Sequence, residues 1–290
     1  MRSSAYVTRY LVPKLGYRIE QCEDAVVVIP ESEPSDEIDE QIVAVMCDGA
    51  SESLLARDWA TLLARHMAEW QRDQVPAGTS ARQTASAVIS AAGKWHQWVD
   101  DYLERREAAG RPLAWYERPG LERGAYATLL TLTLNPPAPY VDAGEELMRL
   151  AQAVNASGTA GWCWQAAALG DTCLFHVRGE QLLHAFPIAD SSAFGTNPPL
   201  AASRSADKSV LAKHITVTHG WCQSGDQLYL ATDALAAWFL QEAEAGKEPW
   251  EFLRDFASRD YRGFEDFVAR KRAEGSLRND DVAFVHIDIG

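Results

Sequence analysis

The sequence predicts an α+β fold, and three observations carry this prediction. Short runs of apolar and β-branched residues gather into two blocks of strand patterns. Two pairs of helical patterns are segregated from these blocks. The strands follow one another as hairpin meanders and do not alternate regularly with helices. Meandering strands with segregated helices are typical of α+β proteins.

Length and composition limit the classes of protein to consider. A chain of 290 residues suits one large domain or two small ones, and it can bury a sizeable core. The apolar content of 47% is ordinary for a globular protein. A net charge of −14 argues against binding to nucleic acid or to an anionic membrane surface.

Cysteine usage and hydropathy predict a cytoplasmic protein. The five cysteines form no CxxC pair and fall mostly in apolar strand patterns, so we expect reduced, buried thiols. No apolar run approaches the length of a membrane span, and the first four residues open no signal peptide.

The first half of the chain contains two strand patterns and then two long helices. Apolar residues over 25–30 and 42–46 predict strands, and the acidic segment between them is expected to be a solvated hairpin connection. A 3.6-residue apolar stripe predicts a helix that Ser51 or Ser53 caps. A second helix is expected over about 81–107, packed antiparallel to the first on one face of a sheet.

The second half predicts a meander of strands and a second pair of helices. Strands are expected over 125–135, 162–169, 172–178, 181–188, 227–232 and 281–289. Helices are expected over 234–244 and 250–273, and segment 136–158 is expected to be an irregular excursion from the sheet. Polar residues over 190–219 predict a long surface loop, a type that often carries function.

Acidic residues recur where the predicted strands begin or end. Asp48 closes an apolar strand and is followed by Gly49, which permits a sharp turn. Three other stretches have carboxylates in the same local setting: Glu23-Asp24, Asp233 and Asp280-Asp281. These four strand-end positions could meet at one edge of a sandwich and hold hard metal ions through oxygen.

Five segments carry a resemblance to a known family. They are RIEQCEDA (18–25), VAVMCDGAS (43–51), ALGDTCLFHVRG (168–179), GDQLYLATDAL (225–235) and NDDVAFV (279–285). In this order and at these intervals, the chain resembles the metal-dependent Ser/Thr protein phosphatases of type 2C, in their bacterial form. The resemblance implies a four-layer α/β/β/α sandwich of two mainly antiparallel sheets flanked by helix pairs. It also implies a single domain over 1–290, with a flap-like loop at about 190–219.

The same resemblance implies two divalent ions, Mg²⁺ or Mn²⁺, and a set of ligands for them. Asp48 would bridge both ions, and the carbonyl of Gly49 would bind the second. Asp233 and Asp280 would bind the first. Asp281 takes the place of an asparagine in the family pattern, where a short polar side chain bonds to nearby backbone.

Three further residues would act around these ligands. Glu23 and Asp24 match acidic residues that hold metal-bound waters, and Arg18 would be the catalytic residue that grips the phosphate. The implied reaction is hydrolysis of phosphoserine or phosphothreonine in a protein, by attack of a metal-activated water. The partner would be a phosphorylated protein, the target of a Ser/Thr kinase.

Several departures from the family pattern favour a second hypothesis about function. Arg18 lies one residue further than usual from the Glu-Asp pair. Ala50 stands where many members carry His or Met, and Ala234 stands where a glycine is usual, so a left-handed turn there would cost energy. The alternative is therefore a non-catalytic or weakly active module that binds a phosphoprotein or regulatory partner. Asp171, in the motif ALGDTCLFHVRG, is expected to tie down its own turn.

Overall fold

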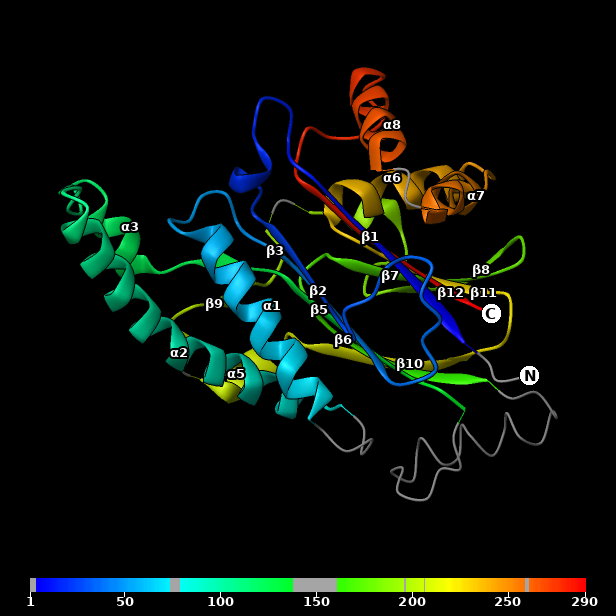
Figure 1. Cartoon of the computed structure of the whole chain (residues 1–290), viewed down its shortest axis with the longest axis horizontal. Helices are drawn as coiled ribbons and strands as arrows, with labels where there is room; N and C mark the ends of the chain where they lie inside the picture. Colours follow the sequence, from blue (N-terminus) through cyan, green and yellow to red (C-terminus); the bar gives the residue numbers. More distant parts are fainter. Residues whose placement is uncertain (1–3, 74–78, 138–160, 196, 206, 259–260) are drawn as a thin grey trace.

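The structure is a computed structural model that describes residues 4–73, 79–137, 161–195, 197–205, 207–258 and 261–290. In these residues two five-stranded sheets lie face to face, and helices cover the outer face of each (Figure 1). The four-layer α/β/β/α sandwich and the α+β class that the sequence predicts are therefore confirmed.

Both sheets are antiparallel throughout. In order across the first sheet, the strands are β1 (Ala5–Val12), β12 (Val282–Ile289), β11 (Asp226–Ala231), β7 (Cys173–Arg178) and β8 (Gln181–Phe186). In order across the second, they are β10 (Thr216–Cys222), β6 (Trp162–Leu169), β5 (Leu129–Asn135), β3 (Ile42–Asp48) and β2 (Asp24–Ile29). A small ladder joins β4 (Tyr126–Ala127) to β9 (Ala201–Ala202).

Each sheet has its own group of helices. The second sheet is covered by α1 (Ala56–Arg72), α2 (Ala81–Ala108) and α5 (Lys208–Ala212). The first sheet is covered by α6 (Asp233–Glu244), α7 (Pro249–Arg254) and α8 (Tyr261–Ala273). A short helix, α3 (Arg118–Arg123), follows α2, and three 3-10 turns lie at Ile19–Gln21, Ser191–Ala193 and Asp255–Ser258. In Figure 1 α1 and α2 run side by side in opposite directions, as expected.

The sheets are buried on both faces because their side chains alternate between two cores. On β3, Val43 and Val45 face α1, whereas Ala44 and Met46 face the other sheet. A strand buried on both faces needs a continuous apolar run, and the run over 42–46 provides it. All five cysteines are buried and none forms a disulfide bond within the described residues, as predicted. Within the described ranges no helix combines the length and hydrophobicity that crossing a bilayer requires.

Three sequence-based expectations about the elements are wrong. The sequence predicts no strand before residue 25, but the structure contains β1 there, an edge strand whose apolar pattern is interrupted by Thr8 and Arg9. Neither serine caps α1: the N-cap is Leu55 with φ 66°, and the Ser53 hydroxyl donates to the Ala50 carbonyl at 2.8 Å instead. The predicted helix over 250–273 is broken into α7, a 3-10 turn and α8.

The predicted loop over 190–219 is also more structured than expected. It contains a 3-10 turn, β9, α5 and the first residues of β10, and the Ala201 carbonyl accepts a hydrogen bond from the Trp59 indole at 2.8 Å. Polar composition hid these short elements because each is stabilised by contacts with distant residues rather than by its own pattern. The predicted strand over 125–135 is interrupted at Thr128, and most of segment 136–158 lies outside the described residues.

A buried ionic network holds the corner where β10 of the second sheet leads into β11 of the first. Asp226 is fully buried, and its two oxygens accept hydrogen bonds from Arg178 Nε and Nη2, both at 2.7 Å. His176 Nε2 lies 2.9 Å from Asp226 Oδ2, and the Gln223 backbone N–H donates to the same oxygen at 2.9 Å. Burial alone would raise the pKa of Asp226, but these donors outweigh it and lower the pKa to about 2.

We predict that Asp226→Asn lowers the free energy of unfolding by about 3 kcal/mol at pH 7, because one partner of a buried pair is removed. Because the pKa is lowered, the carboxylate stabilises the fold fully at pH values above 3.8, which is the ordinary pKa of an aspartate. This contribution is lost as the pH falls towards 2. Urea unfolding of both proteins should therefore show a difference that shrinks below pH 4. Asp101→Asn, an exposed change on α2, is the matched control. A constant difference down to pH 2.5 would contradict the prediction.

Candidate metal centre

The predicted acidic residues come together at one end of the sandwich, close enough for Asp24, Asp233 and Asp280 to affect the pKa of Asp48. Asp24 begins β2 and lies directly opposite Asp48, the last residue of β3. Asp233 is the first residue of α6, immediately after β11, and Asp280 and Asp281 immediately precede β12. Both sheets thus contribute carboxylates to one cluster.

Thr232 joins the two sheets at this cluster. Its hydroxyl donates to Asp24 Oδ2 at 2.9 Å and accepts from the Ala283 backbone N–H at 2.9 Å. Both Thr232 and Asp24 are buried, at 0% and 4% exposure. A buried carboxylate needs such partners because burial without them carries a large desolvation cost. Thr232 therefore fixes the orientation of Asp24 toward the seam between the sheets.

Asp280 and Asp281 have different surroundings, although they are adjacent. Asp281 is buried, and its two oxygens accept the backbone N–H groups of Lys14 at 2.7 Å and Glu23 at 2.8 Å. Asp280 is partly exposed, and among the described residues its carboxylate accepts a hydrogen bond from the neighbouring N–H of Asp281 alone, at 2.9 Å. Asp281 thus bonds to nearby backbone, as expected of the asparagine position, and Asp280 keeps oxygen lone pairs for a ligand.

Asp233 presents one engaged oxygen and one free one. Its Oδ2 accepts Arg278 Nη2 at 2.5 Å, whereas its buried Oδ1 has no hydrogen-bond partner among the described residues. The expected strain at Ala234 is absent: the residue lies in the first turn of α6, and the one non-glycine residue with positive φ in the described chain is Leu55. Alanine suits this position because it is the best helix former.

Burial, and after it the repulsion between neighbouring carboxylates, raises the pKa of several residues in the cluster. Burial raises the pKa of Asp24, and Asp281 adds to the shift; burial and then Asp24, Asp233 and Asp171 raise the pKa of Asp48. Burial also raises the pKa of Asp233, and this outweighs the opposing effect of Arg278. Ionising all of these carboxylates together costs free energy. A bound cation would lower that cost and stabilise the cluster.

Gly49 is required by close packing rather than by a left-handed turn. A Cβ atom at this position would lie 2.8 Å from the Glu23 carbonyl oxygen and 2.9 Å from the Ala56 backbone. The Gly49 N–H donates to the Glu23 carbonyl at 3.2 Å, which keeps the two predicted acidic stretches together. Thr128 holds the preceding residue, since its hydroxyl accepts the Asp48 N–H at 3.0 Å and its own N–H donates to the Asp48 carbonyl at 2.8 Å.

The basic residue beside the predicted Glu-Asp pair is Lys14, not Arg18. Lys14 Nζ lies 3.0 Å from both Glu23 Oε2 and Ser51 Oγ, and the Ser51 hydroxyl donates to Glu23 Oε2. Arg18 is exposed, and in the described chain no hydrogen bond or ion pair joins its guanidinium to a carboxylate. The structure therefore does not bring Arg18 into contact with the cluster.

Four residues of the cluster were missed or undervalued by the sequence analysis: Asp171, Thr232, Lys14 and Arg278. Asp171 bonds to its own backbone, as expected, but it is also buried, and it lies near enough to Asp233 for that carboxylate to raise its pKa. A Gly-Asp turn between two strands was the available signal for it. Lys14 and Arg278 left no comparable signal, since a single base in a loop is usually a surface residue.

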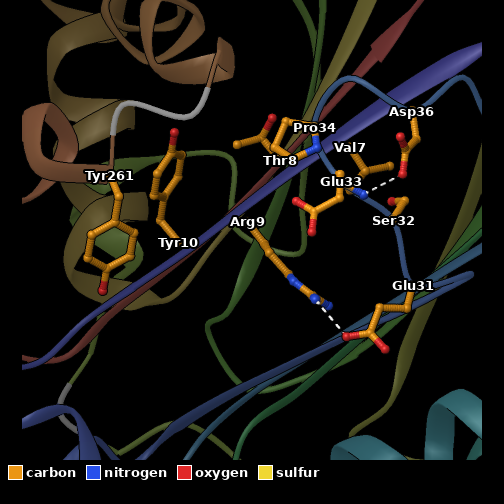
Figure 2. Close-up of a pocket in the computed structure, with 10 residues that line it drawn as sticks. All are labelled: Val7, Thr8, Arg9, Tyr10, Glu31, Ser32, Glu33, Pro34, Asp36 and Tyr261. Carbon is orange, nitrogen blue, oxygen red and sulfur yellow. Dashed lines mark hydrogen bonds and ion pairs between the residues drawn. The ribbon is translucent and has the colours of Figure 1, made fainter.

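Two other features of the structure do not belong to this cluster. The groove in Figure 2, of about 440 Å³, lies between β1, the 31–36 segment and α8, and none of the candidate ligands lines it. His176, Cys222 and Asp226 bring three ligand atoms within 4.8 Å of one another. However, Arg178 already occupies both oxygens of Asp226, and its charge opposes a cation there, so we interpret this set as structural.

The donor set of the cluster fits hard divalent cations. It consists of oxygen ligands, with no thiolate or imidazole among the predicted ligands, and Asp233 Oδ1 is a buried acceptor without a partner. Oxygen ligands of this kind suit Mg²⁺ or Mn²⁺, since Mg²⁺ retains several waters and needs only one or two protein carboxylates.

Comparison with solved structures supports the interpretation of the fold. The serine/threonine phosphatase Stp1 from Staphylococcus aureus superimposes with a TM-score of 0.54 over 98% of this chain and 94% of its own, at 10% identity. A bacterial serine phosphatase gives 0.53 over 97% and 96%, also at 10% identity. The chain has the phosphatase 2C fold.

A third solved structure has a fold similar to that of this chain. The photosystem II phosphatase PBCP matches over 99% of both chains with a TM-score of 0.52 and 12% identity. No protein-family model and no curated protein sequence matches the chain. The phosphatase 2C fold is thus confirmed from structure at identities too low to transfer an activity.

We predict that the chelated protein becomes more stable as the pH falls from 7 to 4. Burial and then Asp233 raise the pKa of Asp171 to about 6, so the folded state binds more protons than the unfolded state over this range. Asp171→Asn should raise the free energy of unfolding at pH 7 by about 1–2 kcal/mol and flatten the pH dependence. Urea unfolding in the presence of a chelator measures both effects. Equal stability and equal slopes in the two proteins would refute the predicted repulsion.

Proposed function

We propose that this chain is a metal-dependent phosphatase that hydrolyses phosphoserine or phosphothreonine in proteins. The observation that carries the proposal is the meeting of carboxylates from separate strand ends at one edge of a phosphatase 2C fold. Opposed acidic residues such as Asp24 and Asp48 destabilise a sheet unless a cation lies between or beside them. A binding role for cations explains why such a cluster exists.

The proposed ligands follow from the accessible oxygens. Asp48, the Gly49 carbonyl, Asp233 and Asp280 would hold two divalent ions, and Glu23 and Asp24 would orient water molecules around them. Bound Mg²⁺ or Mn²⁺ would supply a nucleophilic water near neutral pH and positive charge for the phosphoryl oxygens. The chain itself would position these groups: Thr232 fixes Asp24, Thr128 fixes the Asp48 backbone, and Asp281 fixes the Glu23 backbone.

Cationic side chains at the rim would bind the phosphate of the substrate. Arg18 remains our proposal for this role because it is exposed and lies four residues after Lys14, which contacts the cluster at Glu23. Lys14 is held beside Glu23 and over the Tyr17 ring, with its nitrogen 5.0 Å from the ring centroid. The proposed substrate is a phosphorylated protein in the cytoplasm, the target of a Ser/Thr kinase, and the proposed functional unit is one domain over 1–290.

The second candidate function is a weakly active or non-catalytic module that binds a phosphoprotein or regulatory partner. Two observations favour it. Arg18 does not contact the cluster, and Ala50 offers no titratable side chain where many phosphatases of this type carry one. The two candidates differ in a simple measurement, since only the phosphatase turns over substrate when Mn²⁺ is added.

We predict that the protein hydrolyses a generic aryl phosphate and a phosphoserine peptide with Mn²⁺, and that a chelator abolishes both activities. Asp48→Asn should weaken Mn²⁺ binding by at least the ~10–100-fold that loss of an outer hydrogen-bond partner costs a metal site. Calorimetric titration with Mn²⁺ measures this directly. Asp36→Asn, in the groove of Figure 2, is the control. Mn²⁺ binding without turnover would favour the binding module, and unchanged affinity in Asp48→Asn would refute the ligand assignment.

We also predict opposite consequences for Asp280 and Asp281. Asp280→Ala should abolish Mn²⁺-dependent hydrolysis without loss of stability, because its carboxylate makes only one local hydrogen bond. Asp281→Asn should keep the activity per folded molecule but lower the free energy of unfolding by about 1–3 kcal/mol, since an amide can accept only one of two backbone N–H groups. Kinetics together with thermal melting separate these effects. The reverse pattern would mean that Asp281 is the ligand.

A further inference from the structure

Arg278 places a fixed positive charge on one of the proposed ligands. It lies in the connection between α8 and β12, two residues before Asp280, and its Nη2 is 2.5 Å from Asp233 Oδ2. The Asp233 side chain is 15% exposed, whereas that of Arg278 is 56% exposed. The guanidinium therefore reaches the buried carboxylate from solvent and covers only one of its two oxygens.

The other cations around the cluster act differently. Arg272 donates to backbone carbonyls, at 2.9 Å to Pro13 and also to Asp280, so it ties two loops together without engaging a ligand carboxylate. Lys14 pairs with Glu23, which would bind water rather than an ion. Among Asp48, Asp233 and Asp280, the structure shows a side-chain ion pair at Asp233 alone within the described chain. Arg278 is thus the base in direct contact with a proposed metal ligand.

We infer that Arg278 is a built-in competitor of the metal ion at Asp233. The inference rests on the proposed function, because it assumes that Asp233 Oδ1 binds a divalent cation. A guanidinium on Oδ2 stabilises the cluster by neutralising part of its charge, and it repels a second cation on Oδ1. Arg278 would thereby set the concentration of divalent ion at which the centre fills.

The exposure of Arg278 allows this competition to be reversible. Because the Arg278 side chain is 56% exposed, water can replace the carboxylate as the partner of its N–H groups when a divalent ion binds. The repulsion between the two cations acts through partly solvated surroundings, which reduces it well below its value in a dry interior. Arg278 would therefore weaken metal binding without preventing it.

The test is a calorimetric titration of wild type and Arg278→Gln with Mn²⁺. Removing the competing charge should lower the dissociation constant roughly three- to tenfold, and the gain should shrink in high salt. The control is Arg9→Gln, which removes the same charge from an exposed pair with Glu31 in the groove of Figure 2, away from the candidate ligands. It should leave the dissociation constant unchanged.

A second measurement uses the chelated protein and needs no metal. Arg278→Gln should lower the melting temperature, because Asp233 loses its counter-ion. In an Asp233→Asn background the same change should have no effect, since the carboxylate charge is already gone. Equal effects of Arg278→Gln in both backgrounds would show that the arginine stabilises its loop and not Asp233, which would overturn the inference.

The outcomes distinguish this inference from the proposed function. Equal or weaker Mn²⁺ binding in Arg278→Gln than in wild type overturns the competition and leaves the proposed centre intact. Tighter binding in both Arg278→Gln and Arg9→Gln also overturns it, because the effect would then follow net charge. Absence of Mn²⁺ binding in wild type overturns the proposed centre, and with it the competition.

Discussion

The main constraint on this structure is the mutual repulsion of carboxylates at the seam between its two sheets. Asp24 and Asp48 face each other across β2 and β3, and burial and their acidic neighbours raise the pKa of both. A like-charge pair directly opposed in a sheet is destabilising. The fold accommodates it by surrounding the cluster with donors: the Thr232 hydroxyl, and the basic side chains of Lys14 and Arg278. The same arrangement leaves several oxygens available to a cation.

Buried charge has opposite surroundings at the two ends of β11. At one end Asp226 is fully satisfied by Arg178, His176 and a backbone N–H, and its pKa is lowered. At the other end the Asp233 carboxylate has one oxygen without a hydrogen-bond partner in the part of the chain that the structure describes, and its pKa is raised. Complete hydrogen bonding is what a structural ion pair needs, whereas incomplete hydrogen bonding is what a binding site retains. This contrast, more than the number of acidic residues, separates the candidate centre from the structural network.

The neighbours with this fold share it at 10–12% identity, so the cluster itself carries the functional argument. A fold can host many functions, and a site must be judged by its own chemistry. Here the chemistry is a set of oxygen ligands fixed by backbone contacts on both sheets. The Lys14 backbone N–H donates to Asp281, immediately before the C-terminal strand. Substitutions in the loop containing Lys14 would therefore alter the positions of residues in the cluster.

The sequence by itself determined the layers of the fold and the positions of the carboxylates along the chain. Apolar runs such as 42–46 encode which strands are buried, and acidic residues at their ends indicate where the strands meet solvent. Sequence could not determine which cation faces which anion, because that depends on the register between strands and on the paths of loops far apart in the chain. Only the tertiary structure placed Lys14 beside Glu23, Arg278 on Asp233 and Arg18 in solvent. For the same reason the edge strand β1, the cap of α1 and the short elements within 190–219 escaped prediction, since long-range contacts stabilise them more than local pattern does.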